Sequence, residues 1–198
     1  FEHQMNWKLA IDTFGETYHF NTLHRDTLAK DFHGNCQMYD RFERNHRMML
    51  CLKNIDNLRG QKAEECNVLH ACLPVYYLWP NVQLIMGLNG PTLVRVYPEN
   101  TNPNKSFSRI SFFLAPEIST ELQSNRGSGE SIEDIQARMR GFADVIQKED
   151  YAVAETSHFG ALSGAFDHVM FGRNEPALHH YHNTYRAVLN LPPLEAVS

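Results

Sequence analysis

The feature that most constrains the fold is a series of short apolar runs between about residues 45 and 114. They are rich in β-branched and aromatic residues and have the length of strands rather than helices. Turn-forming residues such as Pro80-Asn81 and Asn89-Gly90-Pro91 separate them. This spacing predicts an antiparallel meander with strands at residues 48–52, 75–79, 82–86, 92–97 and 108–114.

Helical periodicity precedes and follows these runs. Apolar residues recur at three- and four-residue steps from Trp7 to Tyr18, which predicts a helix over residues 6–30. A second helix is expected to begin after Ser131, an N-cap residue followed by acids, and to continue to about Ser157.

The C-terminal region predicts one more helix, from about Glu175 to Leu189, with Pro176 at an early position. Residues 123–130 have the composition of a mobile linker. The order of helix, strands and helices, without βαβ alternation, predicts an α+β fold.

Composition narrows the class of function. The 198 residues are enough for one domain, and a net charge of −5 argues against broad binding to nucleic acid. No apolar stretch is long enough to cross a membrane, so no membrane association is expected.

Four cysteines without CxxC spacing are expected to be reduced thiols in the cytoplasm. The chain begins at Phe1 without an initiator Met, which suggests a piece of a longer chain.

A motif near the N-terminus carries chemistry: Glu16-x-x-His19-x-x-x-x-His24. Histidines five residues apart lie roughly 140° apart around a regular helix, so they would not face one ion. For both to converge, the helix must end or bulge between them, and Asn21-Thr22, two weak helix formers, offers the place.

Two imidazoles and one carboxylate leave three positions open on an octahedral metal, as in non-haem Fe(II) oxygenases. A closed structural zinc site would need a fourth protein ligand. The carboxylate must come from elsewhere in the chain. Helical periodicity alone leaves Asp144, Glu149 and Asp150 as alternatives.

These residues stand in a recognisable order. Asn6-Trp7-Lys8, then Glu16-Thr17-Tyr18-His19 with His24, then Glu149-Asp150, and finally residues 172–176 (Gly-Arg-Asn-Glu-Pro) follow one another along the chain. Over nearly its whole length the chain resembles the catalytic domain of the α subunit of Rieske-type ring-hydroxylating oxygenases. The resemblance implies a helix-grip fold related to START and Bet v 1 domains, with a curved antiparallel sheet around a long C-terminal helix region.

The resemblance also assigns roles. It implies that His19, His24 and Asp150 hold a mononuclear Fe(II), and that Glu16 is the acid that passes electrons from a Rieske cluster in a neighbouring subunit. Where some dioxygenases of the family have Asn, this chain has Thr13. Residues 1–198 would then be a single catalytic iron-binding domain.

The implied activity is hydroxylation of an aromatic or related hydrophobic substrate with O2, as a dioxygenase large subunit in aromatic hydrocarbon catabolism. Electrons would come from NADH through a separate reductase or ferredoxin and a Rieske [2Fe–2S] cluster. The Cys-x-His and Cys-x-x-His pair that binds such a cluster is absent from this sequence, so the cluster domain is expected to precede it. A homotrimer, possibly with a β subunit, is also implied.

Expected substrate-pocket residues are apolar side chains near the motif and on the strands: Phe14, Phe20, Leu23, Met86 and Phe112. The histidines of the run His179-His180-Tyr181-His182 are expected on the solvent-exposed face of an amphipathic helix. The alternative function is a metal-free helix-grip domain that carries a lipid or another small molecule.

Overall fold

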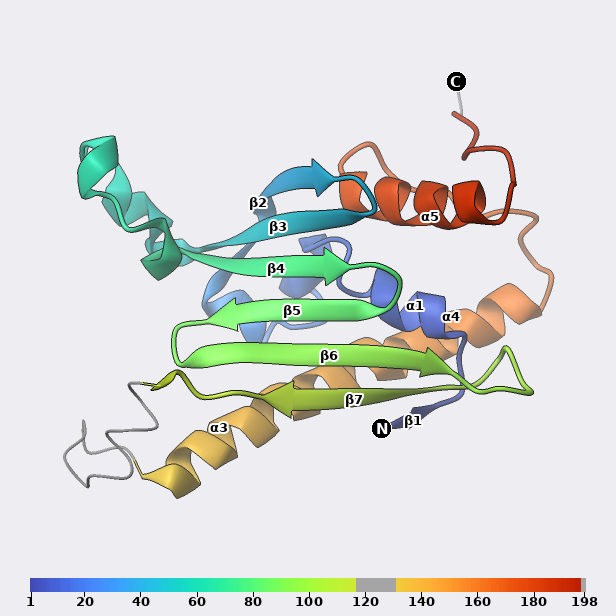
Figure 1. Cartoon of the computed structure of the whole chain (residues 1–198), viewed down its shortest axis with the longest axis horizontal. Coiled ribbons are helices and arrows are strands. Elements are labelled where there is room, and N and C mark those ends of the chain that lie inside the picture. Colours follow the sequence, from blue (N-terminus) through green and yellow to red (C-terminus); the bar gives the residue numbers. More distant parts are fainter. Residues whose placement is uncertain (117–130, 197–198) are drawn as a thin grey trace.

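The computed structural model describes residues 1–116 and 131–196. Its centre is a seven-stranded antiparallel sheet in the order β1-β7-β6-β5-β4-β3-β2 (Figure 1). The strands are β1 Glu2–His3, β2 Phe32–Phe42, β3 Asn45–Leu52, β4 Cys72–Leu78, β5 Val82–Gly87, β6 Gly90–Pro98 and β7 Ser106–Phe112. From β2 to β7 each strand pairs with the next, so the predicted antiparallel meander and the α+β class are confirmed.

Two strands carry no strand pattern in the sequence. β1 has only two residues, and it pairs with β7 through Glu2 opposite Phe107. β2 lacks β-branched residues, and its register with β3 shifts between Phe32 and Gln37. Its place comes from tertiary pairing with β3 rather than from intrinsic strand preference.

The predicted helix over residues 6–30 is wrong beyond its first turns. α1 covers Trp7–Asp12, with the Asn6 side chain accepting a hydrogen bond from the backbone N–H of Lys8. Gly15 then packs so closely that a Cβ there would lie 2.2 Å from Leu178 Cδ2. The chain continues as turns and short 3₁₀ helices at Tyr18–Asn21 and Leu28–Lys30, where weak helix formers and close packing prevent a continuous helix.

The second helical segment is longer than predicted. It comprises α3 Ile132–Val145, a π-helical segment Ile146–Tyr151 and α4 Ala152–Leu162. Ser131 caps it as expected, in a reciprocal capping box with Asp134. The predicted linker at 123–130 lies outside the described residues.

α5 spans Pro176–Val188, close to the predicted bounds, and contacts β2. The histidines of this helix do not all face solvent, which corrects the prediction. His180 is buried, and the half-buried His182 lies 2.9 Å from Asp12 Oδ1 through its Nε2 atom. The helix therefore turns part of its histidine face toward the core.

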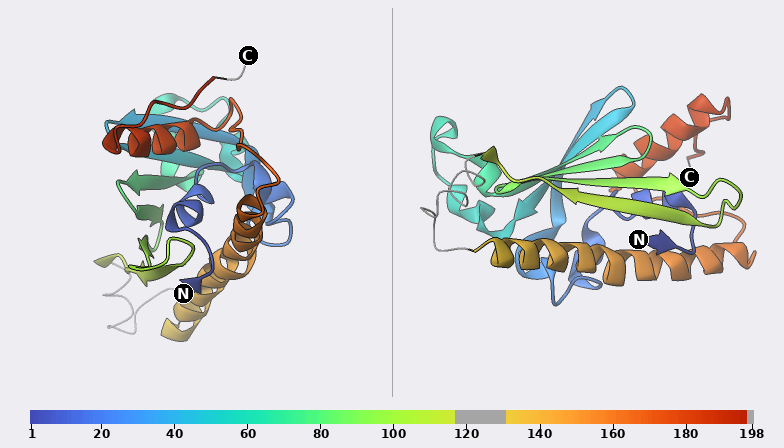
Figure 2. Two further views of the ribbon diagram at one scale, coloured as in Figure 1. Left: turned by 90° about the vertical axis from the view of Figure 1, so that its right-hand side faces the viewer. Right: turned by 60° about the horizontal axis from the view of Figure 1, so that its bottom comes forward.

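The core lies between the sheet and the helices. In Figure 2, α1 lies between the sheet and the long α3–α4 segment, which runs beneath the strands. The strand side chains that form this core are Met48, Leu50, Val75, Tyr77, Ile85, Val94 and Val96. Among the described residues, no helix has the length and apolar character that spanning a membrane requires.

Candidate metal centre

The two histidines of the N-terminal motif converge because neither lies in a regular α-helix, since α1 ends at Asp12 before both of them. His19 lies in the 3₁₀ turn Tyr18–Asn21, and His24 lies in the irregular turn that follows. The two rings have centroids 5.0 Å apart at an interplanar angle of 61°. The α-helix ends at Asp12, earlier than the expected break at Asn21-Thr22, and only a 3₁₀ turn ends at Asn21.

Asp150 reaches these histidines from the π-helical segment. Its Oδ1 atom is 3.1 Å from His24 Nε2 and 3.4 Å from His19 Nε2. One ligand atom from each of the three residues lies within 4.8 Å of the others, close enough to share a metal ion. A π-helix widens the turn and changes the direction of side chains, and such segments often mark functional sites.

The outer nitrogens of both rings are held by carboxylates. Glu16 Oε1 is in close contact with His19 Nδ1, and Glu149 Oε2 is 2.6 Å from His24 Nδ1. Thr27 donates a hydrogen bond of 2.8 Å to the same Glu149 oxygen. With a proton on each Nδ1, both rings direct the lone pair of Nε2 toward Asp150. Glu149, an alternative for the ligand on sequence grounds, thus occupies a different position from Asp150.

The carboxylates around the two histidines favour binding of a cation at this cluster. Burial acts to lower the pKa of His19, but Asp150 and Glu16 outweigh it and raise that pKa to about 9. The pKa of His24 is raised as well, against its burial, by Asp150 and Glu149. Burial acts to raise the pKa of Asp150, and the two histidines instead hold it below its usual value. Three carboxylates around two imidazoles leave net negative charge, which a bound cation would balance.

His19, His24 and Asp150 form a site that fits a metal ion. His24 is 1% exposed and Asp150 is 8% exposed, so both are shielded from water. The buried His19 Nε2 atom makes no hydrogen bond in the described part of the chain and lies 3.4 Å from Asp150 Oδ1. A buried nitrogen without a hydrogen bond is costly. A metal ion among His19, His24 and Asp150 would satisfy it.

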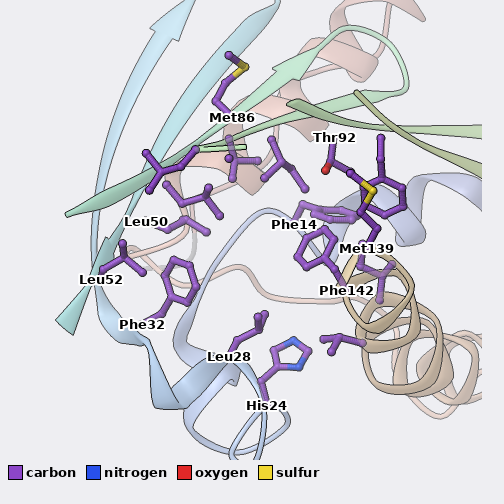
Figure 3. Close-up of a pocket in the computed structure, with 18 of the residues that line it drawn as sticks. Phe14, His24, Leu28, Phe32, Leu50, Leu52, Met86, Thr92, Met139 and Phe142 are labelled. Atoms are coloured by element: carbon purple, nitrogen blue, oxygen red, sulfur yellow. The ribbon is translucent and has the colours of Figure 1, made fainter. Parts of the chain in front are cut away.

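An apolar cavity of about 560 Å³ adjoins the cluster. Figure 3 shows His24 at one end of this cavity and Met86 at the other, with Phe14, Phe32 and Leu50 among the labelled wall residues. Its volume is that of a site for a small organic molecule.

The structure places four of the five expected pocket residues, Phe14, Phe20, Met86 and Phe112, on the wall of this cavity. Leu23 does not contribute to the wall, which corrects that expectation. Phe20 and His24 lie four residues apart, joined by a backbone hydrogen bond of 3.1 Å, and they supply the side of the turn that faces the cavity.

A hydrogen bond that the sequence does not predict joins the start of the C-terminal helix to the histidine motif. Tyr18 donates a hydrogen bond of 2.6 Å to Glu175 Oε1, and Glu175 is 5% exposed. Glu175 also accepts a close hydrogen bond from the backbone N–H of Gly172. The order of these residues along the chain is visible in the sequence, but no spacing rule links positions so far apart.

The fold and site define a class: an α+β domain in which two histidines and one carboxylate meet beside an apolar cavity. The family model for the ring-hydroxylating alpha subunit (catalytic domain) matches residues 1–191. The chain therefore belongs to this family. No match was found among curated proteins.

Solved structures of the quaternary ammonium Rieske monooxygenase CntA have a similar fold. A complex with an inhibitor matches at 14% identity and a TM-score of 0.65, covering 91% of this chain and 45% of that one. A complex with L-carnitine matches at 12% identity and a TM-score of 0.64, covering 93% and 46%. A structure of a quaternary ammonium Rieske monooxygenase, described in terms of carnitine oxidation and inter-subunit electron transfer, matches at 15% identity and a TM-score of 0.65, covering 96% and 47%. The chain spans less than half of the length of these proteins.

Proposed function

We propose that this chain is the catalytic domain of a Rieske-type oxygenase, and that His19, His24 and Asp150 hold a mononuclear Fe(II). The observation that carries the proposal is the convergence of three ligand atoms within 4.8 Å, with the buried His19 Nε2 left without a hydrogen bond in the described part of the chain. Both outer ring nitrogens are held by carboxylates, an arrangement that fixes ligating histidines in metal sites. Membership of the ring-hydroxylating family supports the same conclusion.

The residues of the chain divide the work. Two imidazoles and one carboxylate leave coordination positions open, and Fe(II) in such a site supplies the activation of O2. The cavity holds the substrate beside the metal ligands and keeps water away from them. Among the described lining residues, the carboxylates are Glu16 and Asp150, both at the histidines, and the rest of the wall is mainly apolar. This lining favours an aromatic or other hydrophobic substrate and gives a cationic one no further carboxylate.

We further propose that Glu16 is the electron-transfer bridge. It contacts His19 Nδ1 and is the acid that the family resemblance assigns to this role. Its electrons would come from a Rieske [2Fe–2S] cluster of a neighbouring subunit in a homotrimer, supplied by NADH through a reductase or ferredoxin. A quaternary ammonium Rieske monooxygenase with a similar fold has been described in terms of inter-subunit electron transfer. We also propose that the fold is of the helix-grip type and that the enzyme is a dioxygenase that assembles with a β subunit. Its proposed location is the cytoplasm.

Metal binding tests the proposal directly. The intact protein, freed of metal and incubated anaerobically with Fe(II), is expected to retain about one iron per chain by metal analysis. His19→Ala is expected to reduce retained iron to background because one of the two imidazole ligands is lost. His70→Ala is the matched control, since His70 is exposed and far along the chain from the cluster.

The alternative function predicts the opposite result. A metal-free carrier would bind hydrophobic probes in the cavity and retain no iron in either form of the protein. Product formation that depends on O2 and reductant, and that is lost in His19→Ala, would support the oxygenase. A wild-type protein that never retains iron would favour the carrier.

A further inference from the structure

Three of the four cysteines lie side by side on neighbouring strands. Cys51 of β3 is directly opposite Cys72 of β4 in the strand register. Cys36 lies in β2 at the irregularity between Phe32 and Gln37, next to the point where β2 pairs with the end of β3. All four cysteines are free thiols in the structure.

Cys51 and Cys72 occupy a type of strand position where side chains approach closely. The backbone N–H of Leu52 donates to the carbonyl of Ala71 at 2.9 Å, so this neighbouring pair is a hydrogen-bonded one. Because the two pair types alternate along an antiparallel ladder, Cys51 and Cys72 form a non-hydrogen-bonded pair. Pro74 opposite Met49 agrees with this pattern, since proline has no N–H to donate there. Such pairs have Cα atoms about 4.5 Å apart, within the range that a disulfide spans.

Exposure differs sharply within the cluster. Cys36 is exposed, whereas Cys51 and Cys72 are 1% and 2% exposed. Burial, together with the neighbouring thiols of Cys36 and Cys72, raises the pKa of Cys51 to about 12.

We propose that Cys36, Cys51 and Cys72 form a thiol oxidation site that reduces a hydroperoxide and ends as a Cys51–Cys72 disulfide. The Cys36 thiolate attacks the peroxide O–O bond, which gives a sulfenic acid on Cys36 and releases an alcohol or water. Cys51 displaces the sulfenic hydroxyl as water, which forms a Cys36–Cys51 disulfide. Cys72 then attacks the Cys51 sulfur, and Cys36 leaves as a thiol. Overall, two thiols lose two electrons and two protons, and one hydroperoxide is reduced to an alcohol and water.

The three cysteines are not among the proposed metal ligands, although Cys72 lines the cavity that adjoins them. Met49, Cys51 and Cys72 form a small buried cluster of their own with Ile55, distinct from the main core. The pair also lies where the long connection between β3 and β4, residues 53–71, begins and ends, because β3 ends at Leu52 and β4 begins at Cys72. A disulfide between Cys51 and Cys72 would link the two ends of this connection covalently, and Leu69 within it lines the cavity.

Thiol mapping of the protein tests the proposal. After brief treatment with hydrogen peroxide and alkylation of the remaining thiols, we expect the peptides of Cys51 and Cys72 to be linked, with Cys36 and Cys66 alkylated. A single tryptic cut after Arg59, whose side chain is 83% exposed, divides Cys51 from Cys72. The two fragments should stay together on a non-reducing gel and separate when reduced, which a Cys36–Cys51 disulfide would not produce.

Variants separate the three roles. Cys36→Ser should slow disulfide formation at least tenfold, Cys72→Ser should trap the Cys36–Cys51 disulfide, and Cys51→Ser should abolish both. Cys66→Ser is the matched control, because the Cys66 thiol donates to Lys62 O at 3.3 Å outside this cluster and should change nothing. Over-oxidation of Cys36 without any disulfide, or unchanged linkage in Cys51→Ser, would overturn the proposal. Iron binding is measured independently, so a negative result here leaves the oxygenase proposal intact.

Discussion

The described part of the molecule contains two pairs of histidines from different elements in ring contact, and their surroundings differ. His19 and His24 have ring centroids 5.0 Å apart, and His46 and His180 have centroids 5.3 Å apart. Carboxylates hold the first pair. In the second pair, the Nδ1 atoms lie 3.1 Å apart, His180 Nε2 donates to the Glu43 carbonyl at 2.7 Å, and the ring of Tyr39 lies beside both histidines.

The pKa directions of the two pairs are opposite. Burial, together with the nearby His180, lowers the pKa of His46 to about 3, and burial also lowers that of His180. At the first pair, carboxylates overcome the same effect and raise the pKa of His19 to about 9. Burial of two imidazoles therefore does not make a cation site. The added negative charge does, and the following variants test that difference.

Removal of the ligand carboxylate should have the largest effect. Asp150→Ala is expected to lower retained iron from about one per chain to background and to reduce oxygenase activity at least 100-fold, because a ligand atom and its charge are both lost. Metal analysis and product assay measure this. Asp144→Ala is the matched control on the same helical segment, since Asp144 is exposed and pairs with Lys148 at 2.7 Å. Full iron retention in Asp150→Ala would mean that the two histidine pairs do not differ in the way described.

A smaller loss is expected from the carboxylate behind His24. Glu149→Gln removes the charge that holds His24 Nδ1 but leaves the three proposed ligands in place. Partners of this kind typically contribute 10–100-fold to metal affinity. Competition with a chelator should show iron affinity lowered by that amount. Glu64→Gln, at an exposed position, should leave it unchanged. If Glu149→Gln instead abolished binding as fully as Asp150→Ala, Glu149 would be a ligand.

The fold was predictable where local pattern and tertiary structure agree. The meander follows from short β-branched runs separated by turn residues, and the cap at Ser131 follows from its acidic first turn. β2 and the break after Asp12 were not predictable in this way. β2 depends on pairing with β3, and the break at Gly15 depends on contact with Leu178, which is distant in sequence.

The site was predictable in part. The five-residue spacing of His19 and His24 requires broken helical structure, and the chain has it. A choice between Glu149 and Asp150 needs the direction of side chains in a π-helical segment, which no periodic pattern encodes. The buried position of His180 also depends on α5 packing against the strands, so its helix pattern alone gave the wrong side.

The loss of unfolding free energy at acid pH should depend on His46 of the second histidine pair. His46 has a pKa of about 3 in the folded protein against 6.5 in the unfolded chain, so its stabilising contribution is present above pH 6.5 and lost as pH falls. Between pH 6.5 and 4 this loss amounts to about 3 kcal/mol of unfolding free energy. His46→Gln keeps an N–H donor for His180 but does not titrate. We expect its unfolding free energy, measured by denaturant titration across this pH range, to fall less steeply by about that amount.

Other buried histidines set the reference for this measurement. Burial also lowers the pKa of His3, to about 4, so part of the acid slope must persist in His46→Gln. His3→Gln is the matched variant, and it should remove a smaller part of the slope. A slope unchanged by His46→Gln would show that His46 is protonated in the folded protein, and the contrast between the two pairs would be lost.

A single carboxylate beside a histidine should support stability without making a metal site. Asp12 accepts from His182 Nε2 at 2.9 and 3.0 Å, and this contact joins α1 to α5. Burial raises the pKa of Asp12. Asp12→Asn is expected to lower the unfolding free energy by about 1 kcal/mol, because only one side-chain oxygen is left to accept from His182. A double-mutant cycle with His182→Gln would measure their coupling. Iron retention should not change, since neither residue belongs to the cluster of His19, His24 and Asp150. Loss of iron comparable to that of Asp150→Ala, with stability unaffected, would place Asp12 in the metal site and remove the distinction between a single carboxylate–histidine hydrogen bond and a cluster with excess negative charge.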